Sequence, residues 1–216
     1  QVSVGNPTKQ EDWVSGTRYA SSTKSYDSYG NVTQTTDRNG NSTSYTYDTY
    51  HLYPSSVTNA FSQTTSYIYN YSNGKASQTT DPNGGIIRNI FDGLGRTVET
   101  DQSDPNTPSS LQTKSTFAYT DSPTVPSSVH EVDYLTVATT TDTYDFYDGL
   151  SRLIQERKSS ETPGIFSVSD RTYDTSGNLA AQSLPYFSSG SGNTAATTTR
   201  ALFTWYSYDP LGRKSS

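Results

Sequence analysis

Pairs of an aspartate and an arginine four residues apart recur along the chain, as in Asp92 with Arg96 and Asp148 with Arg152. A carboxylate held beside a cation could work as a general acid or base. A catalytic pair is expected once in a chain, however, and this pair returns in one repeat after another. The recurrence favours a structural interpretation, in which the aspartate caps a turn and takes part with the arginine in ion pairs between neighbouring repeats.

The other residues with chemical potential indicate no catalytic or metal centre. Asp37–Gly40 and Asp81–Gly84 begin like a calcium loop but lack its later oxygen ligands and its terminal Glu. The chain has no Cys and only two His, His51 and His130, and no Ser lies in a GxSxG elbow. We expect no enzyme activity, no metal and no cofactor. The open alternative is a pair of carboxylates in a cleft, as in a glycoside hydrolase.

Aromatic side chains are the second group of candidates, because exposed rings can stack on sugars. Most of them recur once per repeat, and these are expected to form a cross-strand aromatic ladder. Five are less tied to the repeat and are the better candidates for glycan stacking: Tyr19, Tyr45, Tyr186, Trp205 and Tyr206.

One motif underlies both groups: an aromatic residue, Asp, two variable residues, Gly or Ser, and then Arg or Asn. It occurs as YDSYGN at 26–31, FDGLGR at 91–96, YDGLSR at 147–152, YDTSGN at 173–178 and YDPLGR at 208–213. With weaker copies included, the repeat marks fall at 26, 47, 69, 91, 119, 147, 173 and 208, after a lead-in of residues 1–25. The structural motif residues are Tyr26, Asp27, Gly30, Phe91, Asp92, Gly95, Arg96, Tyr147, Asp148, Arg152, Tyr173, Asp174, Gly177, Tyr208, Asp209, Gly212 and Arg213.

The segments between the marks predict two strands per repeat. Val32–Thr36 and Ser42–Tyr47 are Thr-, Ser- and Tyr-rich runs of alternating pattern, and Asp37–Gly40 lies between them as a turn. Its Asn-Gly step predicts a type I′ hairpin. The second turn is the motif itself, in which the Gly is expected to supply a positive φ. Since two strands cannot bury a face alone, neighbouring repeats are expected to pair edge to edge into one sheet.

The composition agrees with an all-β protein. The chain contains 34 Ser and 34 Thr, which are poor helix formers, together with 18 Tyr and 7 Phe, which favour strands. A net charge of −6 with scattered Lys and Arg argues against nucleic acid and membrane surfaces as partners. The lack of Met indicates that Gln1 is a processed end or lies inside a longer polypeptide. The absence of Cys and the abundance of Ser and Thr favour a secreted or cell-surface location.

Residues 26–48, YDSYGNVTQTTDRNGNSTSYTYD, resemble one complete repeat of the YD-repeat or Rhs-repeat family, and FDGLGRTVETD and YDPLGR resemble its consensus turn. The resemblance covers about Tyr26 to Lys214. The family includes bacterial polymorphic toxins, cocoon components of toxin complexes and teneurins, in which the repeats wind a long sheet into a hollow shell. The resemblance therefore implies a structural wall, often around a toxic polypeptide. The copies at 47 and 119 depart from the consensus because they lack the turn Gly.

The sequence therefore predicts an all-β single array over residues 1–216, made of tandem antiparallel hairpins in one continuous curved or spiralling sheet. Eight repeats would supply about 16 strands, a width of ~75 Å, which is too little to close around a folded cargo. The predicted function is that of a non-catalytic segment of a YD-type shell or extracellular assembly, either a toxin-encapsulating wall or a filament subunit. Its predicted partners are flanking repeats of a longer parent chain, or identical subunits, at the open sheet edges. The alternative is an extracellular glycan-binding or adhesive module.

Overall fold

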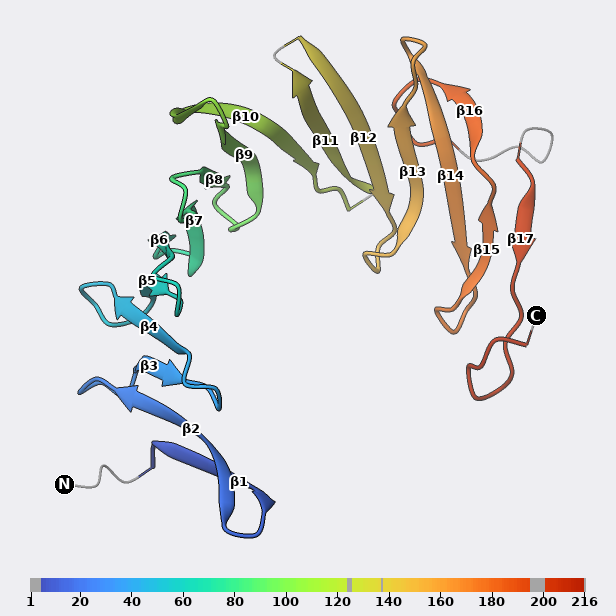
Figure 1. The fold of residues 1–216 in the computed structure, drawn as a ribbon. Coiled ribbons are helices and arrows are strands. Elements are labelled where there is room, and N and C mark those ends of the chain that lie inside the picture. Colours follow the sequence, from blue (N-terminus) through green and yellow to red (C-terminus); the bar gives the residue numbers. More distant parts are fainter. Residues whose placement is uncertain (1–4, 124–125, 137, 195–200, 216) are drawn as a thin grey trace. The chain divides into compact units, whose positions relative to one another are not determined.

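The computed structural model describes residues 5–123, 126–136, 138–194 and 201–215, and Figure 1 traces its ribbon. Within these residues the chain forms seventeen β-strands and no helix. Antiparallel pairing links the strands into one sheet, mostly between strands that are consecutive in sequence. The predicted all-β fold of sequential hairpins is confirmed. The chain divides into two compact units, which we call unit 1 (residues 1–112) and unit 2 (residues 113–216).

Unit 1 is a series of short hairpins in which each strand pairs with the next one. Its last strand, β10, carries the chain into unit 2. The strands are β1 (Lys9–Ser15), β2 (Arg18–Tyr26), β3 (Val32–Thr36), β4 (Ser42–Tyr47), β5 (Pro54–Thr58), β6 (Thr64–Asn70), β7 (Lys75–Thr80), β8 (Ile86–Phe91), β9 (Thr97–Asp104) and β10 (Thr107–Thr120).

Unit 1 buries little. Its strands are rich in Ser and Thr on both faces, so there is little apolar surface to remove from water. Among its described residues, only Asp101 and Ser103 are buried, both at its C-terminal end in β9. Asp101 accepts Arg88 Nε at 2.8 Å, and Ser103 Oγ accepts the N–H of Ile86 at 2.8 Å. Unit 1 is thus held together mainly by its strand pairing and its turns.

Unit 2 has a more complex topology. Its strands are β11 (Ser127–Thr136), β12 (Thr139–Tyr147), β13 (Leu153–Ser159), β14 (Ile165–Tyr173), β15 (Leu179–Ser183), β16 (Tyr186–Ser189) and β17 (Phe203–Trp205). One edge of β14 pairs with β13, while its other edge is shared between β15 and β16. β17 then pairs with β15. The long step between the marks at 173 and 208 holds three strands, which is one more than the two of a regular repeat.

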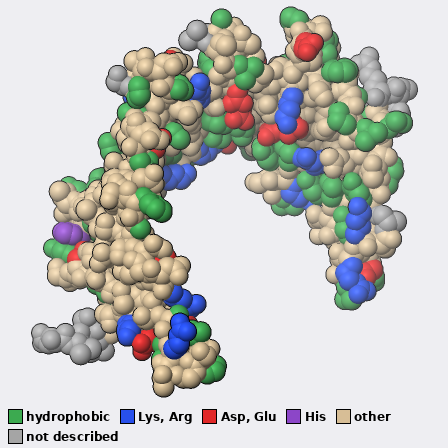
Figure 2. Space-filling view, viewed as in Figure 1, with side chains coloured by type: hydrophobic (Ala, Val, Ile, Leu, Met, Phe, Trp, Pro, Cys, Tyr) green, Lys and Arg blue, Asp and Glu red, His purple; other side chains and the backbone are tan. Residues whose placement is uncertain are grey.

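The buried residues of unit 2 form a real interior. Phe146, Phe166, Val168, Ala181 and Ala201 are its buried hydrophobic residues, and Gln155, Arg157, Asp170 and Ser183 are buried with them. In the view of Figure 2, uncharged polar side chains and glycines, drawn in tan together with the backbone, cover most of the surface, and Lys and Arg are scattered over it without forming a stripe.

The repeat marks fall at the ends of alternate strands. Tyr26, Tyr47, Phe91, Tyr147 and Tyr173 are the last residues of β2, β4, β8, β12 and β14. Tyr69 and Tyr119 each stand one residue before a strand end, and Tyr208 forms an isolated bridge with Lys214. Part of the turn after Tyr119, residues 124–125, lies outside the described residues.

A β-bulge accompanies six of these marks, and the sequence pattern did not predict it. At the first mark, Tyr26 is opposite Val32 while Ser25 is opposite Gln34, so Thr33 is an extra residue on the outgoing strand. The same shift occurs at Tyr47, Tyr69, Phe91, Tyr147 and Tyr173. The turn at Asp37, at the other end of the hairpin, has no such shift. A bulge bends its strand and raises the local twist, so the two ends of each hairpin are not equivalent.

Candidate functional site

The Asp of the motif closes the turn that follows the aromatic residue. Asp92 Oδ1 accepts the backbone N–H of Arg96 at 2.9 Å, and its Oδ2 accepts Arg96 Nε at 2.7 Å. Asp148 and Arg152 repeat this arrangement, with a side-chain bond of 2.8 Å. Where Asn replaces Arg, as in Asp174 with Asn178, the amide takes the place of the guanidinium at 3.2 Å. The predicted turn cap is present, but the ion pair predicted between repeats lies within one turn, because the arginine four residues on reaches back to the aspartate of its own turn.

This bonding opposes acid–base catalysis by the motif. The backbone N–H and the guanidinium of Arg96 hold the pKa of Asp92 below its usual value. The guanidinium and the N–H of Arg152 do the same for the pKa of Asp148. A general base works best with a pKa near the operating pH, whereas these carboxylates are stabilised in their charged form. Their geometry suits a turn cap.

The two turns of a repeat have the same geometry, which corrects the predicted type I′ hairpin. Gly40 N–H donates to Asp37 O at 3.1 Å, just as Gly30 N–H donates to Asp27 O at 3.2 Å. A type I′ turn needs a positive φ at both central residues, but of Asn39 and Gly40 only Gly40 has one, at 86°. The turn is a type I turn followed by a residue in the left-handed region. The side chain of Asp37, rather than the Asn-Gly step, selects it by accepting the N–H groups of Asn39 and Asn41 at 2.8 Å each.

The predicted positive φ occurs at the motif glycines, with 89° at Gly30, 76° at Gly95, 87° at Gly177 and 74° at Gly212. Two described turns that lack this Gly keep the same backbone. His51 and Ser151 occupy the glycine position with φ of 56° and 60°. The ring of His51 stacks on Tyr29 with centroids 3.9 Å apart.

The motif aromatics contact the preceding turn, which corrects the predicted ladder of rings. They stand on alternate strands and are therefore roughly 10 Å apart in the sheet, too far for direct contact. The guanidinium of Arg152 fills one such gap and lies 4.5 Å from the ring centroid of Tyr173. The hydroxyl of Tyr173 donates to Leu153 O at 2.9 Å, and Tyr208 donates to Leu179 O at 3.1 Å. Each of these tyrosines thus joins its repeat to the one before.

The five candidates for glycan stacking do not form one group. Tyr19 and Tyr45 belong to unit 1, while Tyr186, Trp205 and Tyr206 belong to unit 2. Tyr19 and Trp205 are 58% and 72% exposed, so their rings are accessible. Tyr186 instead donates its hydroxyl to Asp170 Oδ2 at 2.7 Å, and Lys214 Nζ lies 3.9 Å from the ring centroid of Tyr206.

A buried polar network in unit 2 was missed at the sequence level. Arg157 is fully buried and donates to Gln155 Oε1 at 2.8 Å, to Thr194 Oγ1 at 2.5 Å and to the carbonyl of Gly190. Gln155 Nε2 donates to Asp170 Oδ1 at 2.6 Å and to Thr194 O at 2.7 Å. The network fastens the segment 189–194 to strands β13 and β14. A polar strand such as LIQERKS gives no signal of this, because its burial depends on a segment more than thirty residues away.

Acidic side chains gather on part of unit 2. Asp145 and Glu156 face each other across β12 and β13, and Asp145 Oδ1 is buried without a hydrogen-bond partner. Burial, followed by the charge of Glu156, raises the pKa of Asp145. Burial and the charges of Asp133 and Asp145 raise the pKa of Glu131. In the described part of the chain, no group of three or more His, Cys, Asp or Glu side chains is arranged to hold a metal ion.

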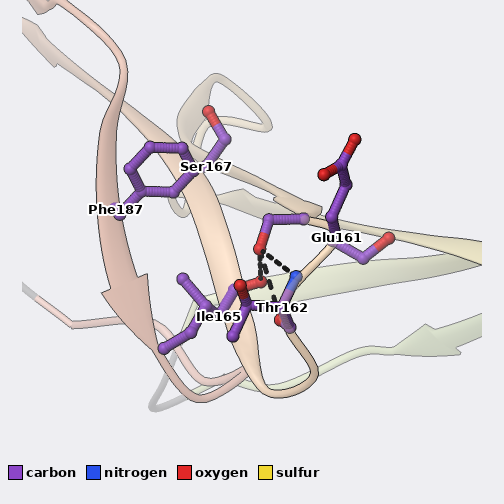
Figure 3. A pocket seen from close by; sticks show the side chains of 7 residues that line it. Glu161, Thr162, Ile165, Ser167 and Phe187 are labelled. Carbon is purple, nitrogen blue, oxygen red and sulfur yellow. Dashed lines mark hydrogen bonds between the residues drawn. The ribbon is translucent and has the colours of Figure 1, made fainter.

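A cleft of about 660 Å³ lies beside the turn between β13 and β14 (Figure 3). It combines hydroxyl groups, one carboxylate and two apolar side chains. Its lining residues are Ser159, Ser160, Glu161, Thr162, Ile165, Ser167 and Phe187. No helix in the described ranges is long and apolar enough to cross a membrane.

Comparisons with known proteins agree with the fold and the repeat. Residues 119–216 match a family described as a domain of unknown function, DUF6443. No curated protein matches the chain. A crystal structure of TcdB2-TccC3 matches with a TM-score of 0.73 and 16% identity, over 96% of this chain and 13% of that one. The Tc holotoxin pore of Photorhabdus luminescens matches with a TM-score of 0.58 and 17% identity, over 88% of this chain and 10% of that one.

These likenesses define the class of fold. The chain has the same fold as the parts of TcdB2-TccC3 and of the Tc holotoxin pore that it matches, which agrees with the fold expected from the YD-repeat resemblance. It spans less than a sixth of the length of either matched structure.

Proposed function

We propose that the chain is a non-catalytic wall segment of a YD-type β-shell or a similar extracellular assembly. The observation that carries the proposal is the repeated turn. In it an Asp side chain accepts backbone N–H groups of the turn, and a Tyr hydroxyl donates to a carbonyl of the preceding repeat, and both bonds recur along the sheet. Such a repeated turn adds strands one after another, and in unit 1 it leaves both faces of the sheet largely polar, which suits a wall. The likeness to toxin-complex structures supports the same role.

The partners in this proposal are further strands at the sheet edges. Among the described residues, β1 pairs only with β2, and six of its seven residues are exposed. An unpaired strand offers a row of N–H and C=O groups to another chain. Flanking repeats of a parent chain, or identical copies adding head to tail, would satisfy these groups. A secreted or cell-surface location and the enclosure of a toxic polypeptide belong to the same proposal, as does the absence of a cofactor.

Sedimentation velocity of the 216-residue chain over a concentration series tests the edge partners. We expect association that grows with concentration, because free copies present unpaired edges. Val14→Lys places a charge on β1, where Val14 is 55% exposed, and should weaken association. Leu94→Lys is the matched control, because Leu94 is 76% exposed but lies in a turn. A monomer at every concentration, or equal effects of the two variants, would contradict the proposal.

A further inference from the structure

The cleft beside the β13–β14 turn has an exposed apolar platform. Phe187 lies within β16 opposite Ser167, and 69% of its surface is exposed. Ile165 lies two residues before Ser167 in β14 and so shares its face of the sheet. An exposed ring beside an aliphatic side chain is ready to be covered by the apolar face of a ligand.

The rim of the cleft is polar and is held by its own turn. Ser160 Oγ donates to Ile165 O at 2.9 Å and accepts the N–H of Thr162 at 3.2 Å, bonds drawn as dashed lines in Figure 3. In this view the carboxylate of Glu161 and the ring of Phe187 stand on opposite sides of the space above Thr162 and Ile165. A rigid turn of this kind lowers the cost of ordering its side chains when a ligand binds.

The volume and the chemistry of the walls select among ligand classes. A volume of about 660 Å³ lies within the usual range for small-molecule sites. The negative charge of Glu161 would repel an anionic ligand. A wholly apolar ligand would displace the water bound to a carboxylate and several hydroxyl groups without replacing those hydrogen bonds. A ring with one apolar face and an edge of hydroxyl groups can contact the apolar side chains of the cleft and also form hydrogen bonds with its polar side chains.

We propose that this cleft binds a hexopyranose unit. The C–H face of the sugar lies over Phe187 and Ile165, and its hydroxyl groups donate to the carboxylate of Glu161 and exchange hydrogen bonds with Ser167. The site is separate from the five aromatic residues that the sequence suggested for glycan stacking. It is also distinct from the aromatic-Asp turns on which the wall function rests, because none of its lining residues belongs to one of those turns.

The test is an NMR titration of the ¹⁵N-labelled full chain with methyl glycosides of glucose, galactose and N-acetylglucosamine. We expect at least one glycoside to shift the amide signals of residues 160–167 and 187, with a dissociation constant on the order of 1 mM. Phe187→Ala should weaken binding about tenfold, and Glu161→Gln about threefold, as for the loss of one modest contact. Phe61→Ala is the matched control, because Phe61 is 84% exposed but lies in unit 1.

Three outcomes would overturn the proposal. The first is the absence of shifts with any of the three glycosides at 20 times the expected dissociation constant. The second is binding that Phe187→Ala leaves unchanged. The third is a response to choline, added as a separate organic cation, that exceeds the response to every glycoside, because cation recognition by Phe187 and Glu161 would then explain the site.

Discussion

Units 1 and 2 are built with the same turn but differ in what they bury. Asp92 in unit 1 and Asp148 in unit 2 make matching bonds to an arginine four residues on. Yet the buried side chains described in unit 1 are Asp101 and Ser103, whereas unit 2 encloses hydrophobic residues around Arg157 and Gln155. The difference shows that the repeat motif by itself is enough to form paired strands. A buried interior forms only where an inserted segment, here residues 189–194, packs over the sheet.

The largest effect should come from removing the buried guanidinium of unit 2. Arg157→Met removes the guanidinium that donates to Gln155 Oε1, Thr194 Oγ1 and the carbonyl of Gly190, and leaves Gln155 Oε1 only the N–H of Thr194 at 3.3 Å, which should cost about 3 kcal/mol. Hydrogen exchange of the full chain should show lower amide protection in β13–β16 and no change in β2–β8. Arg38→Met, which removes an exposed pair with Asp12 in unit 1, should cost less than about 1 kcal/mol. Equal losses for the two variants would erase the distinction between the units.

The next effect concerns the turn that both units share. Gly95→Val should cost about 1–2 kcal/mol, because a branched side chain is strained at a φ of 76° and a Cβ there meets Asn73 Cβ at 3.1 Å. Gly93→Val is the control within the same turn, since a Cβ at Gly93 has nothing within 4 Å and its φ is not positive. Chemical denaturation would measure both. A comparable loss for Gly93→Val would show that the left-handed backbone is not the cause.

The reverse change in unit 2 tests the same backbone. Ser151 adopts a φ of 60° at the glycine position, so Ser151→Gly should stabilise the protein by about 0.5–1 kcal/mol. Thermal unfolding would detect the gain as a raised midpoint. A lowered midpoint would mean that the serine side chain contributes more than its backbone strain costs.

The bond between repeats should have a smaller effect. Tyr173→Phe removes the hydroxyl that donates to Leu153 O at 2.9 Å, at a cost of about 1 kcal/mol. Tyr47→Phe removes the equivalent bond of unit 1, which is longer at 3.2 Å to Val32 O, and should cost less. Urea titrations of the two variants would rank them. The opposite order would indicate that the length of this hydrogen bond does not set its contribution to stability.

The smallest effect is a difference in pH dependence. Asp92 and Asp148 have a pKa lowered by folding, so their stabilisation is present above the unfolded pKa of about 3.9 and is lost as the pH falls through the folded value. Glu131 and Asp145 have a raised pKa, so they weaken the folded state at neutral pH and this penalty fades on acidification.

Unit 2 should therefore gain slightly in stability as the pH falls from 7 towards 5, before both units lose stability below about pH 4. Hydrogen exchange of β11–β13 at pH 7 and at pH 5 would measure the gain. Asp145→Asn should reduce the difference by more than half, because it removes one of the two penalised charges and also removes a charge that raises the pKa of Glu131. A difference that survives undiminished in this variant would point to other groups.

The sequence patterns predicted the strands and the positions at which the strands end. Alternating Thr, Ser and Tyr runs favour strands, and the motif aspartates accept the N–H groups of their own turns, so both features depend on neighbours in the sequence. The marks at Tyr26, Tyr47 and Phe91 therefore coincide with the ends of β2, β4 and β8. The positive φ at the motif glycines was predictable for the same reason.

Other features depended on residues far apart in the chain. The type I′ turn was wrong because the carboxylate of Asp37 outweighs the Asn-Gly preference, and the aromatic ladder was wrong because the spacing across two strands separates the rings. The buried network of Arg157 needs segment 189–194, and the cleft needs β16 beside β14. The hydrogen bonds within each turn were thus determined by the sequence alone. Burial was decided by the tertiary structure, because a polar strand becomes an interior strand only when a distant segment covers it.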